Sequence, residues 1–158
     1  MTDSERSFGP EPQGDDYAKL DVLVVDDNPL NRALVEAILE KLGLQTTSAE
    51  SGAEAIELTA TRAFDLIIMD GRMPGLDGDE TTRRIRARGS SRGALIVRWT
   101  TENDGRLNAA LYDGDLPKPL TCSPLVAAVS LASRRARNRA DHASGGSYSE
   151  GRQQFWTH

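Results

Sequence analysis

The chain has 158 residues, of which 38% are hydrophobic and 27% charged, so it is long enough to form one domain with a sizeable core. Its formal net charge of -5 argues against nonspecific nucleic-acid binding as its main task. The single cysteine, Cys122, excludes an internal disulfide framework, and because no stretch resembles a signal peptide or a membrane span, we expect a cytoplasmic location and no membrane partner.

The first 19 residues differ from the rest of the chain in composition. They carry two prolines, two glycines and only two basic residues, Arg6 and Lys19. Their acidic residues are Asp3, Glu5, Glu11, Asp15 and Asp16. Because such a segment has little apolar surface to bury, we expect residues 1–19 to form a disordered acidic arm.

The first expected element is a buried strand over the apolar residues 22–25. Asn28 can then cap a helix whose first residue is Pro29, and Gly43 ends this helix. The residues expected on its buried face are Leu30, Leu34, Ile38 and Leu42.

In the middle of the chain, expected strands and helices continue to alternate. A half-polar strand over residues 44–49 precedes a helix that Ser51 caps and that ends near Thr61. The run from Leu66 to Met69 ends in Asp70, and such a short apolar run bounded by turn residues is typical of a strand covered on both faces. A helix then opens at Asp77 or Gly78 and runs to about Arg88.

The last third begins with a strand over residues 94–100, followed by a short polar helix over roughly residues 103–112. A compressed fifth strand at Asp115 and Leu116 precedes a helix from about Ser123 to Arg137. We interpret the arginines near its end as favourable to the helix dipole rather than as a nucleic-acid patch. These residues are Arg134, Arg135, Arg137 and Arg139. Residues 140–158 lack an apolar period and are expected to be a flexible tail.

Alternating strands and helices predict an α/β fold with a doubly wound parallel sheet of five strands and helices on both faces. In such sheets, ligands bind beyond the carboxyl ends of the strands. Asp26 and Asp27 follow the first strand and Asp70 ends the third, so three carboxylates are expected to meet there. They would repel one another without a cation, and oxygen ligands of this kind favour Mg²⁺. The sequence therefore predicts a magnesium site.

These residues resemble the receiver domain of two-component response regulators. "VLVVDDNPLNR" is similar to the acidic-pair strand of that family, "MDGRMPGLDG" to its phosphoacceptor loop, and "LPKPL" to the segment with its invariant lysine. Thr100 falls at the family's hydroxyl position. The separations of 43 residues from Asp27 to Asp70 and 30 from Asp70 to Thr100 are also usual for the family. The resemblance extends over about residues 20–133 and assigns residues 20–139 to one receiver domain.

The resemblance implies a flavodoxin-like sheet with strand order 2-1-3-4-5 and a magnesium site built from four residues. Asp27 would be a direct Mg²⁺ ligand, and Asp26 would hold the ion mainly through water. Asp70 and the backbone carbonyl of Arg72 would complete the protein ligands. Phosphoryl transfer depends on positioning and charge neutralisation, which this set would supply.

The resemblance further implies that Asp70 is the phosphorylation site, with a histidine kinase or histidine phosphotransfer protein as phosphoryl donor and a downstream protein as target. Lys118 would place a compact positive charge on the phosphoryl group, and Thr100 would donate its hydroxyl. The Lys118–Pro119 bond would be cis, a geometry available at low cost only before proline. The chain would then be a phosphoacceptor switch with slow self-dephosphorylation, and not an enzyme.

Three features depart from the family pattern. Thr100 and Lys118 are 18 residues apart, about four residues or one helical turn fewer than is usual. Asp115 occupies the position of the usual switch aromatic, three residues before the lysine. Arg98 lies where a central strand is ordinarily apolar, and an unpaired buried charge would be costly there. Arg98 either pairs with Asp115 or extends into space left by the shorter helix; Trp99 is expected in the core.

Two other readings stay open. The chain could be a receiver-fold binding module that works without phosphorylation, because the parts that usually transmit the signal are altered. It could also be a haloacid-dehalogenase-like phosphatase, although that class has a second acid two residues after its nucleophile, where this chain has Arg72. The receiver reading fits either a stand-alone regulator or a segment of a hybrid kinase.

Overall fold

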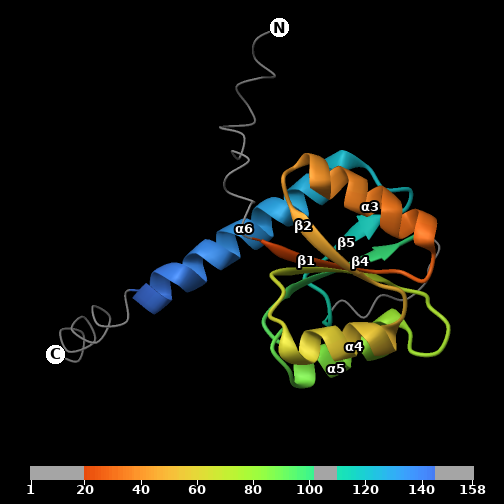
Figure 1. The fold of residues 1–158 in the computed structure, drawn as a ribbon, viewed down its shortest axis with the longest axis horizontal. Helices are drawn as coiled ribbons and strands as arrows, with labels where there is room; N and C mark the ends of the chain where they lie inside the picture. The colour runs from red at the N-terminus through yellow and green to blue at the C-terminus, as the bar shows by residue number, and fades with distance from the viewer. Residues whose placement is uncertain (1–19, 102–109, 145–158) are drawn as a thin grey trace, which may run out of the picture.

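The computed structural model describes residues 20–101 and 110–144, and Figure 1 shows how their strands and helices are arranged. The strands are β1 (Asp21–Val25), β2 (Gln45–Ala49), β3 (Leu66–Asp70), β4 (Leu95–Thr100) and β5 (Gly114–Pro117). The helices are α3 (Pro29–Lys41), α4 (Gly52–Thr61), α5 (Gly78–Ala87) and α6 (Cys122–Ser144). The expected acidic arm and most of the expected short polar helix, residues 102–109, lie outside the described residues.

All five strands pair in parallel in the order β2-β1-β3-β4-β5. This confirms the predicted doubly wound sheet and its strand order. β3 lies between β1 and β4, and all five of its residues are buried. The continuous apolar run before Asp70 follows from this position, because a central parallel strand has no face exposed to water.

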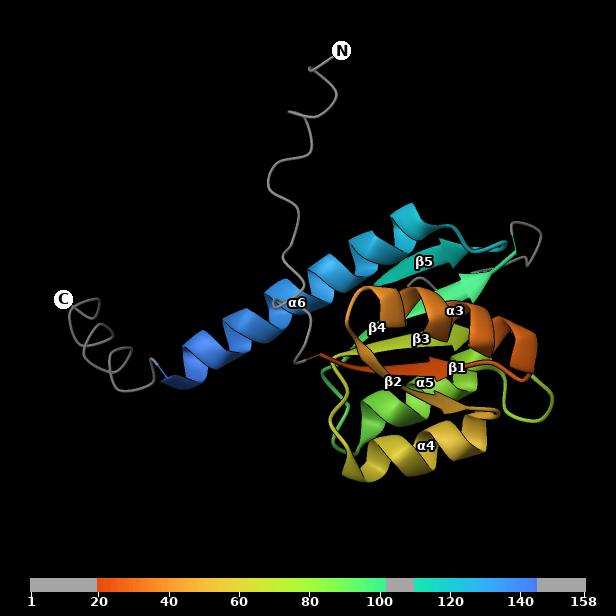
Figure 2. The same cartoon turned by 45° about the horizontal axis from the view of Figure 1, so that its top comes forward.

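Among the described residues, two helices cover each face of the sheet. In Figures 1 and 2, α3 and α6 lie on one side of the strands, and α4 and α5 on the other. The first core combines Val35 and Leu39 of α3 with Leu125 and Val129 of α6. The second contains Ala55 of α4 and Ile85 of α5, among others. The paired layers confirm the predicted helices on both faces.

Side-chain caps begin three of the helices where the sequence predicts them. Asn28, Ser51 and Asp77 have extended backbones, and their side chains accept hydrogen bonds from the N–H groups of Leu30, Glu54 and Glu80. A cap of this kind contributes about 1 kcal/mol to stability. The caps of α3 and α5 also fix where these helices begin, directly beside the carboxyl ends of β1 and β3.

The predicted buried face of α3 is wrong at its first two positions. Leu30 and Leu34 are 78% and 46% exposed, whereas Val35 and Leu39 are fully buried. An α-helix turns by about 100° per residue, so each step of four residues rotates the side chain by a further 40° or so. Positions 30 and 42 therefore cannot share one face, and only Ile38 and Leu42 of the predicted set pack against the core.

The last helix is longer than predicted. α6 continues to Ser144, past the expected end at Arg137 and into the expected tail, and Figure 2 shows its second half projecting from the sheet. No glycine or proline interrupts the chain between Pro124 and Gly145, so nothing in the sequence stops the helix earlier. The arginine cluster consequently lies within the helix, and its interpretation as a complement to the helix end is wrong. Of the expected tail, residues 145–158 lie outside the described part of the chain.

Candidate functional site

Acidic side chains from two strands meet at the carboxyl edge of the sheet. Asp26 and Asp27 directly follow β1, and Asp70 is the last residue of β3, the neighbouring strand. Each of the three offers a carboxylate oxygen, and these oxygens all lie within 4.8 Å of one another. The structure therefore brings together the acidic cluster that the sequence predicts.

A lysine that follows β5 reaches the same acidic cluster. Lys118 directly follows β5, and its Nζ lies 3.0 Å from Oδ1 of Asp70 and 3.7 Å from Oδ2 of Asp26. The Lys118 backbone N–H donates to the carbonyl of Thr100 at 2.8 Å, and its Nζ stands 4.8 Å from the centre of the Trp99 ring. The Lys118–Pro119 bond is cis, as the resemblance implies.

Asp26 is fixed by the beginning of α3. Its buried carboxylate accepts hydrogen bonds from the Asn28 N–H at 2.8 Å and from Nδ2 of Asn31 at 3.1 Å. Its backbone carbonyl accepts a hydrogen bond from Arg32 at 2.7 Å. Sequence reasoning missed the roles of Asn31 and Arg32, although both belong to the "DDNPLNR" stretch. These hydrogen bonds hold the Asp26 carboxylate in one orientation in the absence of a ligand.

Asp70 has an unusual protonation equilibrium because it is only 4% exposed. The pKa of Asp70 is raised from 3.8 to about 6, chiefly because the carboxyl is buried and also because the charge of Asp26 is close to it. The hydrogen bonds that Asp70 accepts from Lys118 and from the Arg72 N–H at 3.2 Å work in the opposite direction. Burial prevails, so the metal-free site resists holding all its negative charges at once.

The donor set fits a hard divalent cation. Three ionised carboxylates and the Lys118 ammonium leave a formal charge of -2 in the cluster, and all the candidate ligand atoms of the acids are oxygens. Mg²⁺ prefers such ligands and takes one or two carboxylates while keeping water. Asp26, Asp27 and Asp70 could therefore hold this ion, with Asp27 the most exposed of the three.

Gly78 allows α5 to begin against the site. A Cβ atom at this position would collide with the backbone carbonyl of Asp70, and the Gly78 N–H donates to the Gly71 carbonyl at 3.3 Å. The sequence pattern indicated Gly78 only as a possible helix start. A larger residue would push α5 and the loop after Asp70 apart.

Two other predicted site residues occupy the same edge. Thr100 ends β4, is buried, and has its hydroxyl 3.4 Å from the Thr101 carbonyl. Arg72 is exposed in the loop after β3 and contacts Asp70 through its backbone N–H. The roles of the Thr100 hydroxyl and the Arg72 carbonyl remain predictions.

At the position of the family's usual switch aromatic, this chain has Asp115, with Arg98 on the neighbouring strand. Arg98 and Asp115 are opposite each other in the β4–β5 register, but Arg98 Nε lies 4.0 Å from the carboxylate and forms no hydrogen bond with the described residues. The pair is thus at the limit of ion-pair distance, and the Arg98 guanidinium also stands 5.8 Å from the centre of the Tyr112 ring. The Tyr112 hydroxyl donates to Asp79 at 2.7 Å, a contact that sequence analysis missed. Trp99 is buried, which confirms its place in the core.

Comparison with known proteins identifies the family. The response regulator receiver domain model matches residues 22–130, and the chain belongs to this family. It is 33% identical over 118 residues to the sensor histidine kinase RcsC of Salmonella typhi, covering 73% of this chain and 12% of that protein. It is also 47% identical over 66 residues to the sensor protein GacS of Pseudomonas syringae pv. syringae, covering 42% of this chain and 7% of that protein.

Solved structures show the same fold. The receiver domain of the sensor histidine kinase PA1611 from Pseudomonas aeruginosa PAO1 superposes with a TM-score of 0.65 at 29% identity, covering 72% of this chain and 97% of that one. That structure has a magnesium ion coordinated in its active site cleft. A CheY-like receiver domain protein from Methanospirillum hungatei JF-1 gives a TM-score of 0.66 at 30% identity, covering 75% and 97%. The receiver fold is that of a phosphoacceptor switch rather than a classical enzyme.

Within residues 20–101 and 110–144, no helix is long and apolar enough to span a membrane.

Proposed function

We propose that this receiver domain accepts a phosphoryl group on Asp70 from a phosphohistidine of a histidine kinase or histidine phosphotransfer protein. The observation that carries the proposal is the position of Lys118, whose Nζ lies 3.0 Å from Asp70 within a cluster of three acids. A lone acid at a strand end could simply begin a turn. Three neighbouring acids, two of them in contact with Lys118, have no comparable structural purpose, because their mutual repulsion costs stability.

The proposed reaction is an in-line transfer. An Asp70 oxygen attacks phosphorus, the bond from phosphorus to the donor imidazole nitrogen breaks, and that nitrogen keeps the electron pair. Lys118 already touches the attacking carboxylate and can follow the charge onto a phosphoryl oxygen. Thr100, at the end of the neighbouring strand, would donate its hydroxyl to another phosphoryl oxygen.

The reaction would depend on Mg²⁺. Asp26, Asp27, Asp70 and the Arg72 carbonyl would hold the ion, which when bound neutralises the charge between carboxylate and phosphoryl group. Asn28 and Asn31 hold Asp26 in place for this purpose. The magnesium ion in the active site cleft of the PA1611 receiver supports this part of the proposal.

An apolar surface next to the site suits the phosphoryl donor. Leu30 and Leu34 are exposed on α3, the helix that begins two residues after Asp27. Two exposed leucines one turn apart on this helix would suit contact with a protein donor. The kinship with RcsC and GacS, both named as sensor proteins, points to a partner of the histidine kinase class.

A second candidate function is a receiver-fold binding module that acts without phosphorylation. It is favoured by Asp115, which replaces the usual switch aromatic and has a side chain that is half exposed. Both candidates signal by protein contact, and they differ in whether Asp70 gains a phosphoryl group.

Intact mass spectrometry distinguishes the two candidates. The full chain is incubated with Mg²⁺ and a small acyl-phosphate donor, beside an Asp70→Asn variant and an Asp21→Asn control at the opposite end of the sheet. We expect the wild type and the Asp21→Asn control to gain one phosphoryl unit and Asp70→Asn to gain none. If the wild type gained nothing from this donor or from a cognate kinase, the binding module would be the better account.

A further inference from the structure

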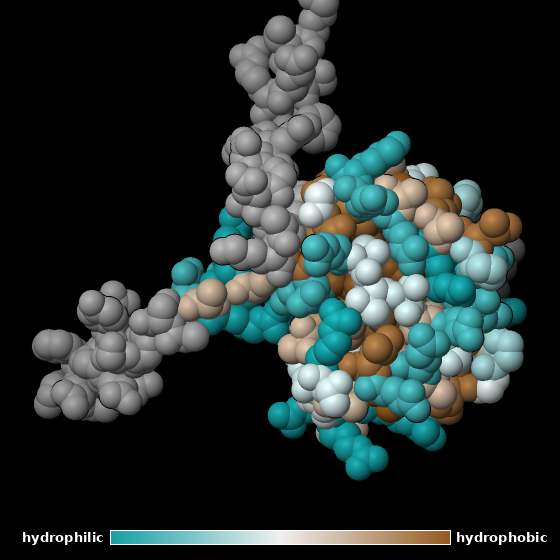
Figure 3. Space-filling model, in the orientation of Figure 1, coloured by the Kyte–Doolittle hydropathy of each residue, from teal (hydrophilic) through white to brown (hydrophobic). Residues whose placement is uncertain are grey.

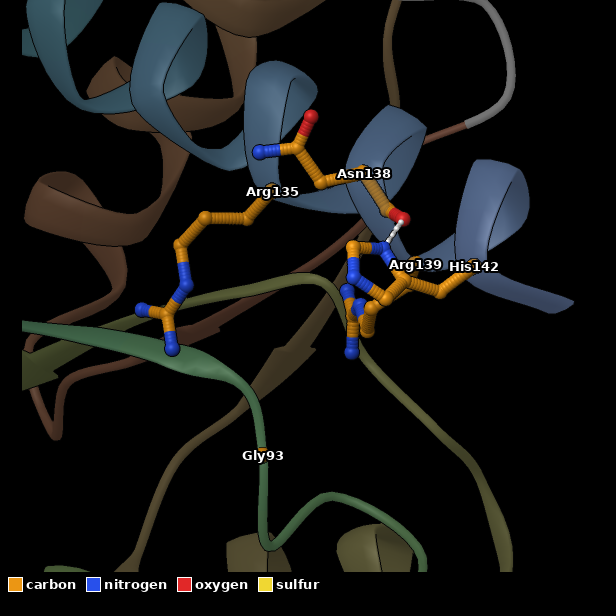
Figure 4. Close-up of a pocket in the computed structure, with 5 residues that line it drawn as sticks. All are labelled: Gly93, Arg135, Asn138, Arg139 and His142. Atoms are coloured by element: carbon orange, nitrogen blue, oxygen red, sulfur yellow. Dashed lines mark hydrogen bonds between the residues drawn. The ribbon is translucent and has the colours of Figure 1, made fainter. Parts of the chain in front are cut away.

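A basic pocket lies at the end of the sheet opposite the phosphoacceptor. Its lining residues are Gly93, Arg135, Asn138, Arg139 and His142, and its volume is about 410 Å³. We call it the α6 basic pocket. Figure 4 shows the α6 side chains on successive turns of that helix, with Gly93 on the facing chain before β4. His142 Nδ1 lies 2.8 Å from the Asn138 carbonyl oxygen.

The two pocket arginines keep hydrogen-bonding capacity for a ligand. Arg139 lies 3.0 Å from Asp65, and Arg135 lies 3.6 Å from Asp113. The Asp113 carboxylate is closer to Arg86, at 2.8 Å, and also accepts from the Ile96 N–H. A guanidinium has five N–H donors, so neither contact saturates its arginine.

The surroundings of the pocket are also cationic. Arg134 and Arg137 are exposed on the same stretch of α6. Among the described residues of this helix, Asp141 is the one that is acidic. In Figure 3 the visible part of α6 beyond the sheet carries hydrophilic side chains beside weakly hydrophobic ones. The arginines make this surface attractive to an anionic partner.

The first described residues, which directly follow the acidic segment 1–19 in the sequence, lie beside this pocket. The Asp21 N–H, where β1 begins, donates to one oxygen of Asp65 at 2.9 Å, and the other oxygen binds Arg139. The Asp65 carboxylate thus links the start of β1, to which segment 1–19 is attached, with Arg139 of the pocket. Asp15 and Asp16 precede Asp21 by five or six residues, a reach of up to about 20 Å along an extended chain. Arg135 and His142 are only about 10 Å apart along the helix.

We infer that the acidic residues of segment 1–19 dock intramolecularly on the α6 basic pocket and cover its positive charge. The segment carries five acidic residues against two basic ones, which complements the arginines of α6. Attachment at Asp21 keeps the segment at an effective concentration in the millimolar range, so individually weak contacts suffice. The inference does not depend on phosphorylation, because the pocket and Asp70 lie at opposite ends of the strands.

Paramagnetic relaxation enhancement in the full chain tests this contact. Cys122, which is exposed, is replaced by serine, and a spin label is attached after Ser4→Cys. At about 10 mM salt, where the Debye length is about 30 Å, we expect amide signals of residues 135–142 to lose intensity relative to about 1 M salt, where it is about 3 Å. Changing the five arm acids to Asn and Gln should abolish the difference.

Two matched pairs of substitutions on α6 locate the contact. Arg135→Gln with Arg139→Gln removes two charges from the pocket, and Arg134→Gln with Arg137→Gln removes two beside it. We expect the first pair to abolish the intensity loss and the second to leave most of it. Equal effects of both pairs would show diffuse attraction and overturn the pocket as the docking site.

Two other outcomes would overturn the intramolecular contact. If broadening arose only when a spin-labelled chain was mixed with a separate isotope-labelled chain, the occupant would be a second copy, and the intramolecular contact would be wrong. If residues 135–142 showed no salt-dependent broadening while duplex DNA shifted their signals in the wild type, the pocket would be a nucleic-acid site instead.

Discussion

Opposing effects act on the pKa of Asp70, the proposed phosphoryl acceptor. Burial raises its pKa, whereas Lys118 and the Arg72 N–H favour the ionised form. Without a cation the site therefore costs folding free energy that a divalent ion can recover. The oxygens of Asp26 and Asp27 lie within 4.8 Å of Asp70, so one ion could contact all three carboxylates.

Removing the charge of Asp70 should stabilise the metal-free protein at neutral pH. A carboxyl whose pKa rises from 3.8 to about 6 on folding destabilises the folded state above pH 6, and this penalty disappears as the pH falls towards 4. We expect Asp70→Asn to raise the free energy of unfolding by roughly 1 to 3 kcal/mol at pH 7.5, since one pKa unit is worth about 1.36 kcal/mol.

Urea unfolding in EDTA, followed at pH 7.5 and pH 4.5, measures this effect. The advantage of Asp70→Asn should shrink at the lower pH, and saturating Mg²⁺ should favour the wild type instead. An Asp70→Asn variant less stable than the wild type at pH 7.5 in EDTA would contradict the proposed balance of charges.

Lys118 should act on the rate of phosphoryl transfer more than on the fold. Its Nζ contacts both Asp70 and Asp26, so Lys118→Met removes a charge-assisted donor from the carboxylate that we propose as phosphoryl acceptor. We expect the initial rate of phosphorylation by a small acyl-phosphate donor to fall on the order of 100-fold, as for other preorganised donors. Lys41→Met, a substitution of an exposed lysine at the end of α3, is the matched control and should leave the rate unchanged. Equal rates for the two variants would remove Lys118 from the mechanism.

Individual strands, helix starts and the acidic cluster could be predicted because their signals are local. The caps Asn28, Ser51 and Asp77 and the apolar run before Asp70 each lie within a few residues of what they determine. The end of α6 was missed because its sequence changes from apolar to basic without a helix-breaking residue. The Tyr112–Asp79 contact could not be predicted, because it joins residues 33 positions apart through the tertiary fold.

The Arg98–Asp115 pair on β4 and β5 should contribute little. The two groups are 4.0 Å apart without a hydrogen bond at Nε, and the Asp115 side chain is half exposed. We expect a double-mutant cycle with Arg98→Met and Asp115→Asn to give a coupling energy below about 1 kcal/mol, because water screens the half-exposed Asp115 carboxylate. A coupling energy well above that value would restore the pair as a substitute for the switch aromatic.

At the scale of the whole molecule, the parallel sheet separates two charged regions. The carboxyl ends of β1 and β3 gather the acids, and the amino ends of the same strands lie beside the arginines of α6. Five residues of strand span about 17 Å, so ligands at the two ends do not touch. The exposed leucines belong to the first half of α3, the helix that begins at Pro29 directly after the turn at Asp26 to Asn28, where the proposed phosphoryl donor would approach.

Locating a divalent ion tests most directly whether the acids of β1 and β3 form one metal site. Crystals of the full chain soaked in Mn²⁺, which has the oxygen preference of Mg²⁺ and an anomalous signal, would show the ion in an anomalous difference map. We predict one peak among the carboxylate oxygens of Asp26, Asp27 and Asp70 and the Arg72 carbonyl, absent in an Asp27→Asn crystal. A saturating soak with no peak there, or with the ion bound elsewhere while the three carboxylates stay together, would contradict the account.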